Sequence, residues 1–146
     1  MKKLLLTILL ALFLIGNTFA KDTKLICEYK ETFYRNWNNN QFGETIIDES
    51  ATKIAYFFNI TKNNDNDYGF ETNIRLPNLQ SIKDTKFESI VDDNNYLFTA
   101  QKNRLYVSIG INRYNGALTT QTGHTNDGGK YLIQSSYICK KGEQKF

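Results

Sequence analysis

Several residue types are nearly missing from this chain of 146 residues. Proline, tryptophan, histidine and methionine occur once each, and the only methionine is the initiator. The chain therefore lacks the methionine-rich, adaptable surface that promiscuous binding proteins use. A single histidine argues against a zinc site built on several imidazoles. The sequence also contains no run of five or six like charges, which argues against a basic arm that binds a membrane.

The net charge of the chain is small as well. Eighteen Lys and Arg residues against fifteen Asp and Glu residues give +3, and two of the basic residues are Lys2 and Lys3 at the start of the chain. A protein that binds nucleic acid needs a basic patch or stripe. The composition therefore predicts no nucleic-acid partner.

The first twenty residues have the features of a secretory signal peptide. Lys2 and Lys3 precede an apolar run from Leu4 to Gly16. In Thr18-Phe19-Ala20, which follows, the first and third residues are small, as at the two positions that signal peptidase recognises. The run is shorter than the roughly 20 apolar residues of a membrane span, although an uncleaved anchor is the alternative. We expect residues 1–20 to be cleaved and residues 21–146 to form one exported domain, periplasmic or extracellular. No membrane insertion is expected after the signal is removed.

The two cysteines, Cys27 and Cys139, predict a disulfide, because an even number of cysteines in an oxidising compartment normally pairs. Bridged Cα atoms lie within about 7 Å of each other. The first and last strands must then be neighbours, either paired or facing each other across a core. A metal-binding or redox pair is the alternative, but neither cysteine has a neighbouring histidine or a C-x-x-C partner.

Alternation of apolar and polar residues predicts strands along most of the chain, most clearly over residues 105–111. Residues 45–48 and 53–60 are expected to form a hairpin, and Asn115-Gly116 is typical of a hairpin turn. Residues 78–91 fit neither period well, and we expect a short helical turn followed by a strand. The pattern predicts an all-β fold, an antiparallel meander of about eight strands forming a small barrel or sandwich closed by one disulfide.

Few residues stand in patterns that carry chemistry. His124 lies in a polar segment, residues 122–129, and no G-x-S-x-G motif accompanies it, so we expect a surface-loop residue rather than a base. Residues 63–69 are as rich in Asn and Asp as a calcium loop, but Gly69 comes one position too late. We expect a turn there, with a weak cation site as the alternative. Phosphate-binding loops and dinucleotide motifs do not occur, and no catalytic residue, metal ligand or cofactor is predicted.

Aromatic residues are the one sign of a binding surface. The chain has nine tyrosines and ten phenylalanines. A core with aromatic cross-strand pairs would use many of them. The alternative is a binding face or a barrel cavity with aromatic anchors. The candidates for such anchors are Trp37, Phe42, Tyr68 and Tyr96.

One stretch carries a family resemblance. Residues 109–118 read Ile-Gly-Ile-Asn-Arg-Tyr-Asn-Gly-Ala-Leu, and Cys139-Lys140-Lys141 stands near the end of the chain. This arrangement resembles small uncharacterised exported bacterial proteins that combine an N-terminal cysteine strand, an I-x-R-x-x-G-x-L hairpin and a C-terminal Cys-Lys. Ile138 replaces the glycine that those proteins have before the last cysteine. The resemblance implies a fold outline and an export route, and it implies no activity.

Together these features predict a non-enzymatic exported domain that binds a protein or an envelope glycan, for example as an inhibitor of an envelope hydrolase or a toxin. One alternative is a lipocalin-like carrier of a small apolar ligand, which would need an internal cavity of roughly 300–1,000 Å³. Another is a small hydrolase that uses carboxylates or His124. Its carboxylates would converge in a cleft and have raised pKa values.

Overall fold

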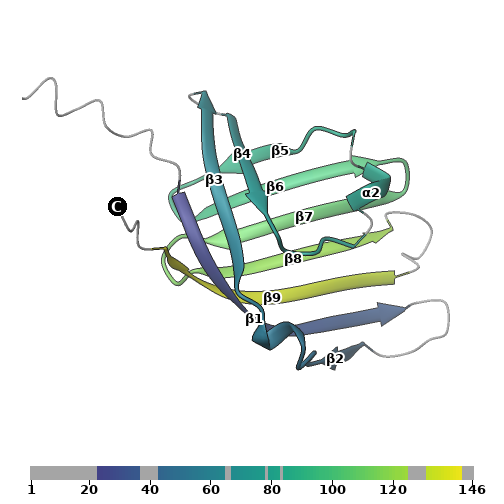
Figure 1. Ribbon diagram of the computed structural model, residues 1–146. Helices are drawn as coiled ribbons and strands as arrows, with labels where there is room; N and C mark the ends of the chain where they lie inside the picture. The colour runs from purple at the N-terminus through teal and green to yellow at the C-terminus, as the bar shows by residue number, and fades with distance from the viewer. Residues whose placement is uncertain are drawn as a thin grey trace, which may run out of the picture.

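The computed structural model describes residues 23–36, 43–64, 67–77, 79–82, 84–124 and 131–142. Nine strands, one turn of 3-10 helix and one turn of α-helix occupy these segments (Figure 1). They are β1 (Thr23–Asn36), β2 (Glu44–Ile46), η1 (Ala51–Lys53), β3 (Tyr56–Asn64), β4 (Asp67–Thr72), α2 (Leu79–Ile82), β5 (Glu88–Val91), β6 (Asn95–Lys102), β7 (Leu105–Asn112), β8 (Ala117–His124) and β9 (Tyr131–Lys141). The expected signal peptide, residues 1–20, lies outside the described residues. Among the described residues, no helix is long and apolar enough to cross a membrane.

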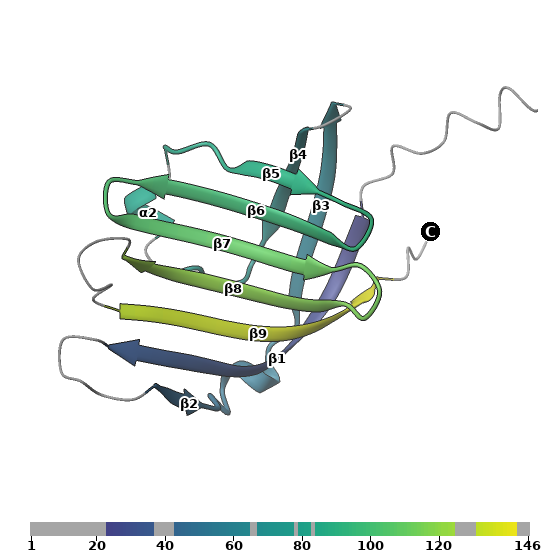
Figure 2. The same cartoon turned by 180° about the vertical axis from the view of Figure 1, so that it is seen from behind.

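The strands form one antiparallel sheet in the order β4-β3-β1-β9-β8-β7-β6-β5, with β2 also paired to β1. β5 to β9 make a simple meander, and β9 then pairs with β1 along nearly its whole length. The sheet curls until β4 lies beside β5, as Figures 1 and 2 show from opposite sides. The result is a barrel that is closed everywhere except between β4 and β5, which confirms the expected all-β antiparallel fold.

The expected hairpin between residues 45–48 and 53–60 is wrong. β2 and β3 do not pair with each other, because both pair with β1, β2 with its second half and β3 with its first half. The Asp48 carboxylate accepts hydrogen bonds from the backbone N–H groups of Ser50 (2.9 Å) and Ala51 (3.3 Å) at the start of η1. This turn carries the chain onward along β1 instead of reversing it, so β2 and β3 act as one interrupted strand.

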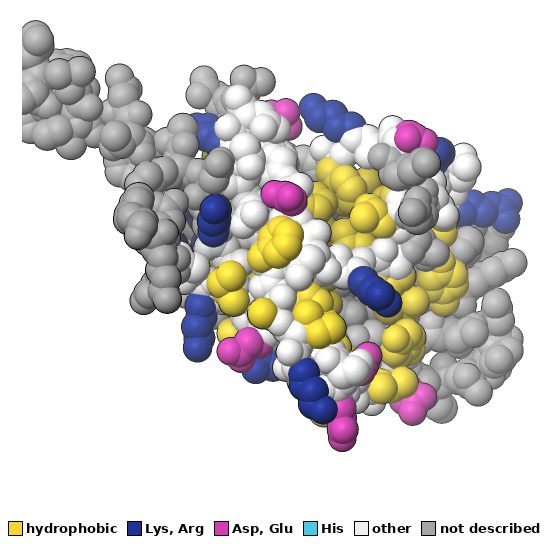
Figure 3. Space-filling view, viewed as in Figure 1, with side chains coloured by type: hydrophobic (Ala, Val, Ile, Leu, Met, Phe, Trp, Pro, Cys, Tyr) yellow, Lys and Arg dark blue, Asp and Glu magenta, His cyan; other side chains and the backbone are white. Residues whose placement is uncertain are grey.

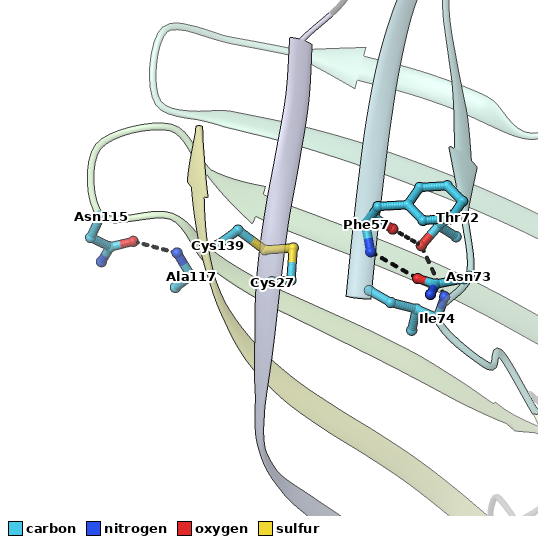
Figure 4. Close-up of a disulfide and its surroundings, with 8 residues drawn as sticks. All are labelled: Cys27, Phe57, Thr72, Asn73, Ile74, Asn115, Ala117 and Cys139. Carbon is cyan, nitrogen blue, oxygen red and sulfur yellow. Dashed lines mark hydrogen bonds between the residues drawn. A yellow bond between two sulfur atoms is a disulfide. The ribbon is translucent and has the colours of Figure 1, made fainter. Parts of the chain in front are cut away.

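One strand is longer than the sequence expectation. β8 continues to His124, into the segment expected to be a loop, and its last residue pairs with Leu105. β4 ends at Thr72 because the chain there turns back onto β3. The Thr72 hydroxyl donates to the Phe57 carbonyl (2.6 Å), and the Asn73 side-chain oxygen accepts from the Phe57 N–H (2.8 Å; Figure 4). The expected helical turn and following strand are present as α2 and β5.

The centre of the barrel is filled by side chains. Phe58, Phe98, Ile109 and Leu118 are fully buried there. The ring of Phe70 stacks on Phe58, with 5.2 Å between ring centroids, and lies 5.0 Å from the ring of Phe98. A small barrel is usually filled in this way rather than hollow. Most of the aromatic residues that the structure describes lie in this core or pack against it, so they have a structural role.

Apolar side chains also reach the surface on the half of the sheet that β3 and β4 leave uncovered (Figure 3). Tyr34, Ile46 and Leu79, from β1, β2 and α2, are each more than a third exposed. Surface hydrophobics in small numbers are common in soluble proteins. Here they lie where the interior of the barrel meets the solvent.

The disulfide joins the two ends of the chain. Cys27 in β1 and Cys139 in β9 are directly opposite partners in the ladder, with their Cα atoms 3.9 Å apart (Figure 4). Both side chains are buried. The expected bond and the expected contact of the first and last strands are both confirmed, and the two strands are paired rather than facing across a core.

Candidate functional site at the mouth of the barrel

One end of the barrel opens into a pocket of about 820 Å³. In Figure 1 it lies at the left end, where β1 begins, β9 ends and the β7–β8 turn reverses the chain. The lining residues come from β1, β3, β6, β7, the β7–β8 turn and β9. They are Thr23, Leu25, Ile60, Tyr96, Ile111, Asn112, Arg113, Tyr114, Asn115, Gly116, Cys139, Lys140 and Lys141. We call this the mouth pocket.

The β7–β8 turn that forms one wall of the mouth pocket is fixed by its own residues. The Asn112 side-chain oxygen accepts from the N–H groups of Tyr114 (3.0 Å) and Asn115 (3.1 Å). Gly116 has a φ of 70°, and a Cβ atom there would collide with the carbonyl oxygen of Cys139. Only glycine adopts this conformation without strain and allows so close an approach. The Cys139 N–H in turn donates to the Gly116 carbonyl (2.8 Å), which holds the turn against β9 beside the disulfide.

The floor of the mouth pocket is apolar. Leu25, Ile60, Ile111 and Cys139 face the interior of the barrel and are all less than a tenth exposed. Below them the interior is closed by the packed side chains of the barrel centre. The pocket is therefore a cup at one end of the barrel and not a channel through it.

Three cations surround this apolar floor. Arg113 follows β7, and Lys140 and Lys141 end β9. Lys141 pairs with the inward-facing Leu25, so it lies on the inner side of the sheet, whereas Lys140 pairs with the outward-facing Ile26. In the part of the chain that the structure describes, none of the three forms an ion pair with a carboxylate. The rim therefore has positive charge that is compensated only in part, through a weak electrostatic interaction between Arg113 and the Asp92 carboxylate.

Arg113 is held in a defined position. Its guanidinium lies over the ring of Tyr96, 5.1 Å from the centroid, and its Nη1 donates to the backbone carbonyl of Asp92 (2.8 Å). A cation over an aromatic face is attracted by the ring quadrupole. Because neither partner neutralises it, the guanidinium keeps its full charge while its orientation is restricted.

The candidate binding aromatics of the sequence fall in different places. Tyr96 lines the mouth pocket and lies under Arg113. Tyr68 packs edge-to-face against Tyr96, with 5.8 Å between ring centroids, and joins β4 to the β5–β6 side of the barrel. Trp37 and Phe42 lie outside the described residues. Tyr96 therefore lines the mouth pocket, and Tyr68 packs behind Tyr96 without lining the pocket.

Two carboxylates in the described part of the chain have shifted pKa values, and both are shifted downward. Hydrogen bonds from Ser50 and Ala51 hold the pKa of Asp48 below its usual value. Backbone N–H groups of Asn94 and Asn95 lower the pKa of Asp92, with a smaller effect from Arg113. A general acid needs the opposite shift. The backbone of His124 ends β8, but its side chain lies outside the described part.

In the segment expected to be a turn, residues 63–69, β3 ends at Asn64 and β4 begins at Asp67, and residues 65–66 lie outside the described residues. Asp67 forms an ion pair with Lys86 (3.4 Å). Across the described residues, no cluster of three or more His, Cys, Asp or Glu side chains could hold a metal ion.

The cationic rim was missed by reasoning from the sequence. Its signal is present in the sequence, because Lys140 and Lys141 directly follow Cys139 and Arg113 precedes the Asn115-Gly116 turn. Only the pairing of β9 with β1 and the position of the β7–β8 turn bring these cations around one pocket.

Comparisons with known proteins give no relative for this chain. No family model matches it, and neither a curated protein nor a solved structure is significantly similar. The resemblance to exported bacterial proteins with a terminal cysteine pair remains a prediction.

Proposed function

We propose that the protein is a non-enzymatic binding domain whose mouth pocket takes a small acidic ligand with an apolar part. The observation that carries the proposal is the combination of an apolar floor with three cations at its rim that form no ion pair with a described carboxylate. An apolar group of the ligand would be removed from water when it packs against Leu25, Ile60 and Ile111, which is favourable. An acidic group would meet Arg113 and Lys141 at the rim, where charge-assisted hydrogen bonds are the stronger kind.

The packed interior favours this cup over an enclosed carrier of the lipocalin type. A carrier needs a cavity inside the barrel, whereas Phe58, Phe98 and Ile109 occupy the centre here. A hydrolase receives less support, because the two described carboxylates with shifted pKa values are both shifted downward. A protein or glycan partner outside the pocket, including an inhibited hydrolase or toxin, remains a prediction.

The setting that we propose is an exported one. The buried disulfide is compatible with an oxidising compartment, where such bonds persist. We infer that the chain is delivered to the periplasm or the extracellular space by its first twenty residues.

A titration with octanoate and with octanol tests the proposal. The two probes have the same apolar chain, but only octanoate has a negative charge. We expect saturable binding of octanoate by calorimetry, weakened by added salt because exposed charges are screened. Octanol should bind at least several-fold more weakly. Equal binding of the two probes would show that the cations have no part in the site.

Variants that remove single charges test whether octanoate binds in the mouth pocket. Arg113→Gln and Lys141→Gln should each weaken octanoate binding roughly 2–5-fold, the usual effect of one exposed ionic contact. Lys102→Gln is the matched control, because Lys102 is an exposed cation at the end of β6 and does not line the mouth pocket. The same loss in the control would place the ligand elsewhere on the protein.

A further inference from the structure

The outer face of β6, β7, β8 and β9 has an unusual composition. Every second residue points outward over Asn95–Gln101, Tyr106–Asn112, Ala117–Gly123 and Leu132–Ile138, and none of these outward residues is charged. Charged residues make up 23% of the chain, and neighbouring β1 has Lys24, Glu28, Glu31 and Arg35 exposed on its outer side. In Figure 2 the outer side of β6 to β9 is turned toward the viewer.

Polar side chains connect neighbouring strands across this face. Gln121 donates through its side-chain nitrogen to the side-chain oxygen of Gln134 (2.8 Å), and the Ser108 hydroxyl lies 3.5 Å from the side-chain oxygen of Gln121. Thr99 is the next residue in this row, opposite Ser108. The row therefore offers hydroxyl and amide groups as donors and acceptors with no net charge.

A depression of about 560 Å³ lies at the β6 end of this row. β5 begins only at Glu88, which pairs with Thr99 of β6. The end of β6 beyond Thr99 therefore has no partner strand on this side, and residues 85 and 86 line the depression there without pairing with β6. Its lining includes Thr99, Gln101, Ser108 and Tyr106, together with two charged residues, Lys86 and Glu88. Hydroxyl, amide, ammonium and carboxylate groups and one aromatic ring thus meet in a single concave place.

The ring of Tyr106 has a fixed place in this depression. A Cβ atom at Gly123, its partner on β8, would lie 2.9 Å from Tyr106 Cε1 and 3.1 Å from its hydroxyl oxygen, so the ring leans over the glycine. An aromatic ring that covers a glycine on a neighbouring strand helps to fix the strand pairing. Partial burial also raises the pKa of the Tyr106 phenol, so the hydroxyl is a neutral donor and acceptor.

We propose that this depression and the uncharged row beside it bind a neutral oligosaccharide. A pyranose ring has an apolar C–H face and a rim of hydroxyl groups. The C–H face would pack on Tyr106, and the hydroxyls would exchange hydrogen bonds with Thr99, Gln101 and Ser108. An uncharged saccharide needs no opposite charge. This agrees with the row, whose outward residues carry no charge, and with the depression, where Lys86 and Glu88 have opposite signs. The site is distinct from the mouth pocket, since the two share no lining residue.

A second copy of the chain fits this face less well. The cores of protein–protein interfaces are rich in aromatic and large apolar residues. The row of Thr99, Ser108, Gln121 and Gln134 at the centre of this face is polar instead. Dimerisation is therefore an outcome for the experiment to detect, not the expected result.

The test is a titration of the disulfide-bonded protein with chitotetraose and cellotetraose, followed by NMR. We expect at least one of these neutral probes to cause saturable shifts of the Gln101 and Gln134 side-chain amides. Tyr106→Ala should weaken binding about tenfold through lost stacking, and Tyr106→Phe should retain most of it. Gln101→Ala, at an exposed position, should weaken binding roughly fivefold and avoids any folding defect of Tyr106→Ala.

Tyr114→Ala is the matched control, because Tyr114 is 78% exposed in the β7–β8 turn of the mouth pocket. It should leave saccharide binding unchanged. Absence of saturable binding by both probes would overturn the proposal, as would equal weakening in Tyr114→Ala. Sedimentation that shows a dimer disrupted by Gln121→Lys, with no saccharide effect, would assign the face to a second copy instead.

Discussion

The barrel is closed by two very different contacts. At the junction of β1 and β9, eleven residue pairs form a continuous ladder with one bulge, and the Cys27–Cys139 disulfide crosses it. Where β4 meets β5, the described strands form no backbone ladder, and the hydrogen bond between them joins a backbone N–H to a side chain. We call the first contact the junction and the second the seam.

Side chains make a modest link across the seam. The Tyr68 N–H donates to the Ser89 hydroxyl (3.0 Å), and Lys86 pairs with Asp67. The rings of Phe70 and Phe87 pack edge-to-face, with 4.9 Å between their centroids. Backbone groups on the remaining facing edges of β4 and β5 do not pair with each other, so opening the seam breaks few hydrogen bonds.

The two contacts also differ in sequence separation. The cysteines of the junction are 112 residues apart, so bringing them together costs the unfolded chain much entropy. The seam joins strands that are close in sequence and loses less entropy on closing. We infer that the junction carries global stability, whereas the seam is the first place where the barrel opens locally.

Removing the disulfide should have the largest effect on the junction. The double variant Cys27→Ser with Cys139→Ser should lose roughly 2–5 kcal/mol of unfolding free energy, because the unfolded chain is no longer restricted by a long closed loop. Thermal melting of the oxidised protein against the variant measures the loss as a drop of several degrees or more.

Replacing both cysteines together avoids leaving a free thiol that could react. A melting temperature that does not change would contradict the assigned role of the junction. Titration of two free thiols in the native protein would show that the bond is not formed at all.

The free energy of unfolding should also fall at high pH, because of a tyrosine at the junction. Burial raises the pKa of Tyr137 to about 12, from an ordinary value of 10.0, and Tyr56 and Tyr29 lie beside it. Between these two pH values the unfolded chain releases the phenolic proton and the folded protein keeps it. Stability is therefore complete below pH 10 and falls as the pH rises toward 12, by about 2–3 kcal/mol in total.

Denaturant unfolding at pH 8, 10 and 11.5 measures this slope. Tyr137→Phe should flatten it, leaving the smaller contributions of Tyr56 and Tyr106, whose pKa values are also raised by burial. Tyr114→Phe is the control, since Tyr114 is 78% exposed and should leave the slope unchanged. The idea fails if Tyr137→Phe retains the full dependence on pH.

The junction could be predicted from the sequence, and the seam could not. Two cysteines and the alternation around Leu105 are local signals that predict a disulfide-closed β fold. The route of the chain from β2 to β3 depends on the Asp48 hydrogen bonds, and a polar cluster there is equally typical of a hairpin turn. Similarly, the grouping of Arg113 with Lys141 needs the ladder of β1 with β9, which local periodicity does not specify.

The smallest effect is expected at the seam, where Ser89→Ala removes the hydroxyl that accepts the Tyr68 N–H. We expect a loss of about 1 kcal/mol for local opening, the usual value of one hydrogen bond, and hence roughly fivefold faster amide exchange at Tyr68. Exchange at Cys139, whose N–H donates to Gly116 beside the junction, should not change. Lys86→Gln is the control, because its side chain is 80% exposed and such pairs contribute little. If Ser89→Ala speeds exchange equally at Tyr68 and Cys139, the two contacts open together and the barrel is one cooperative unit.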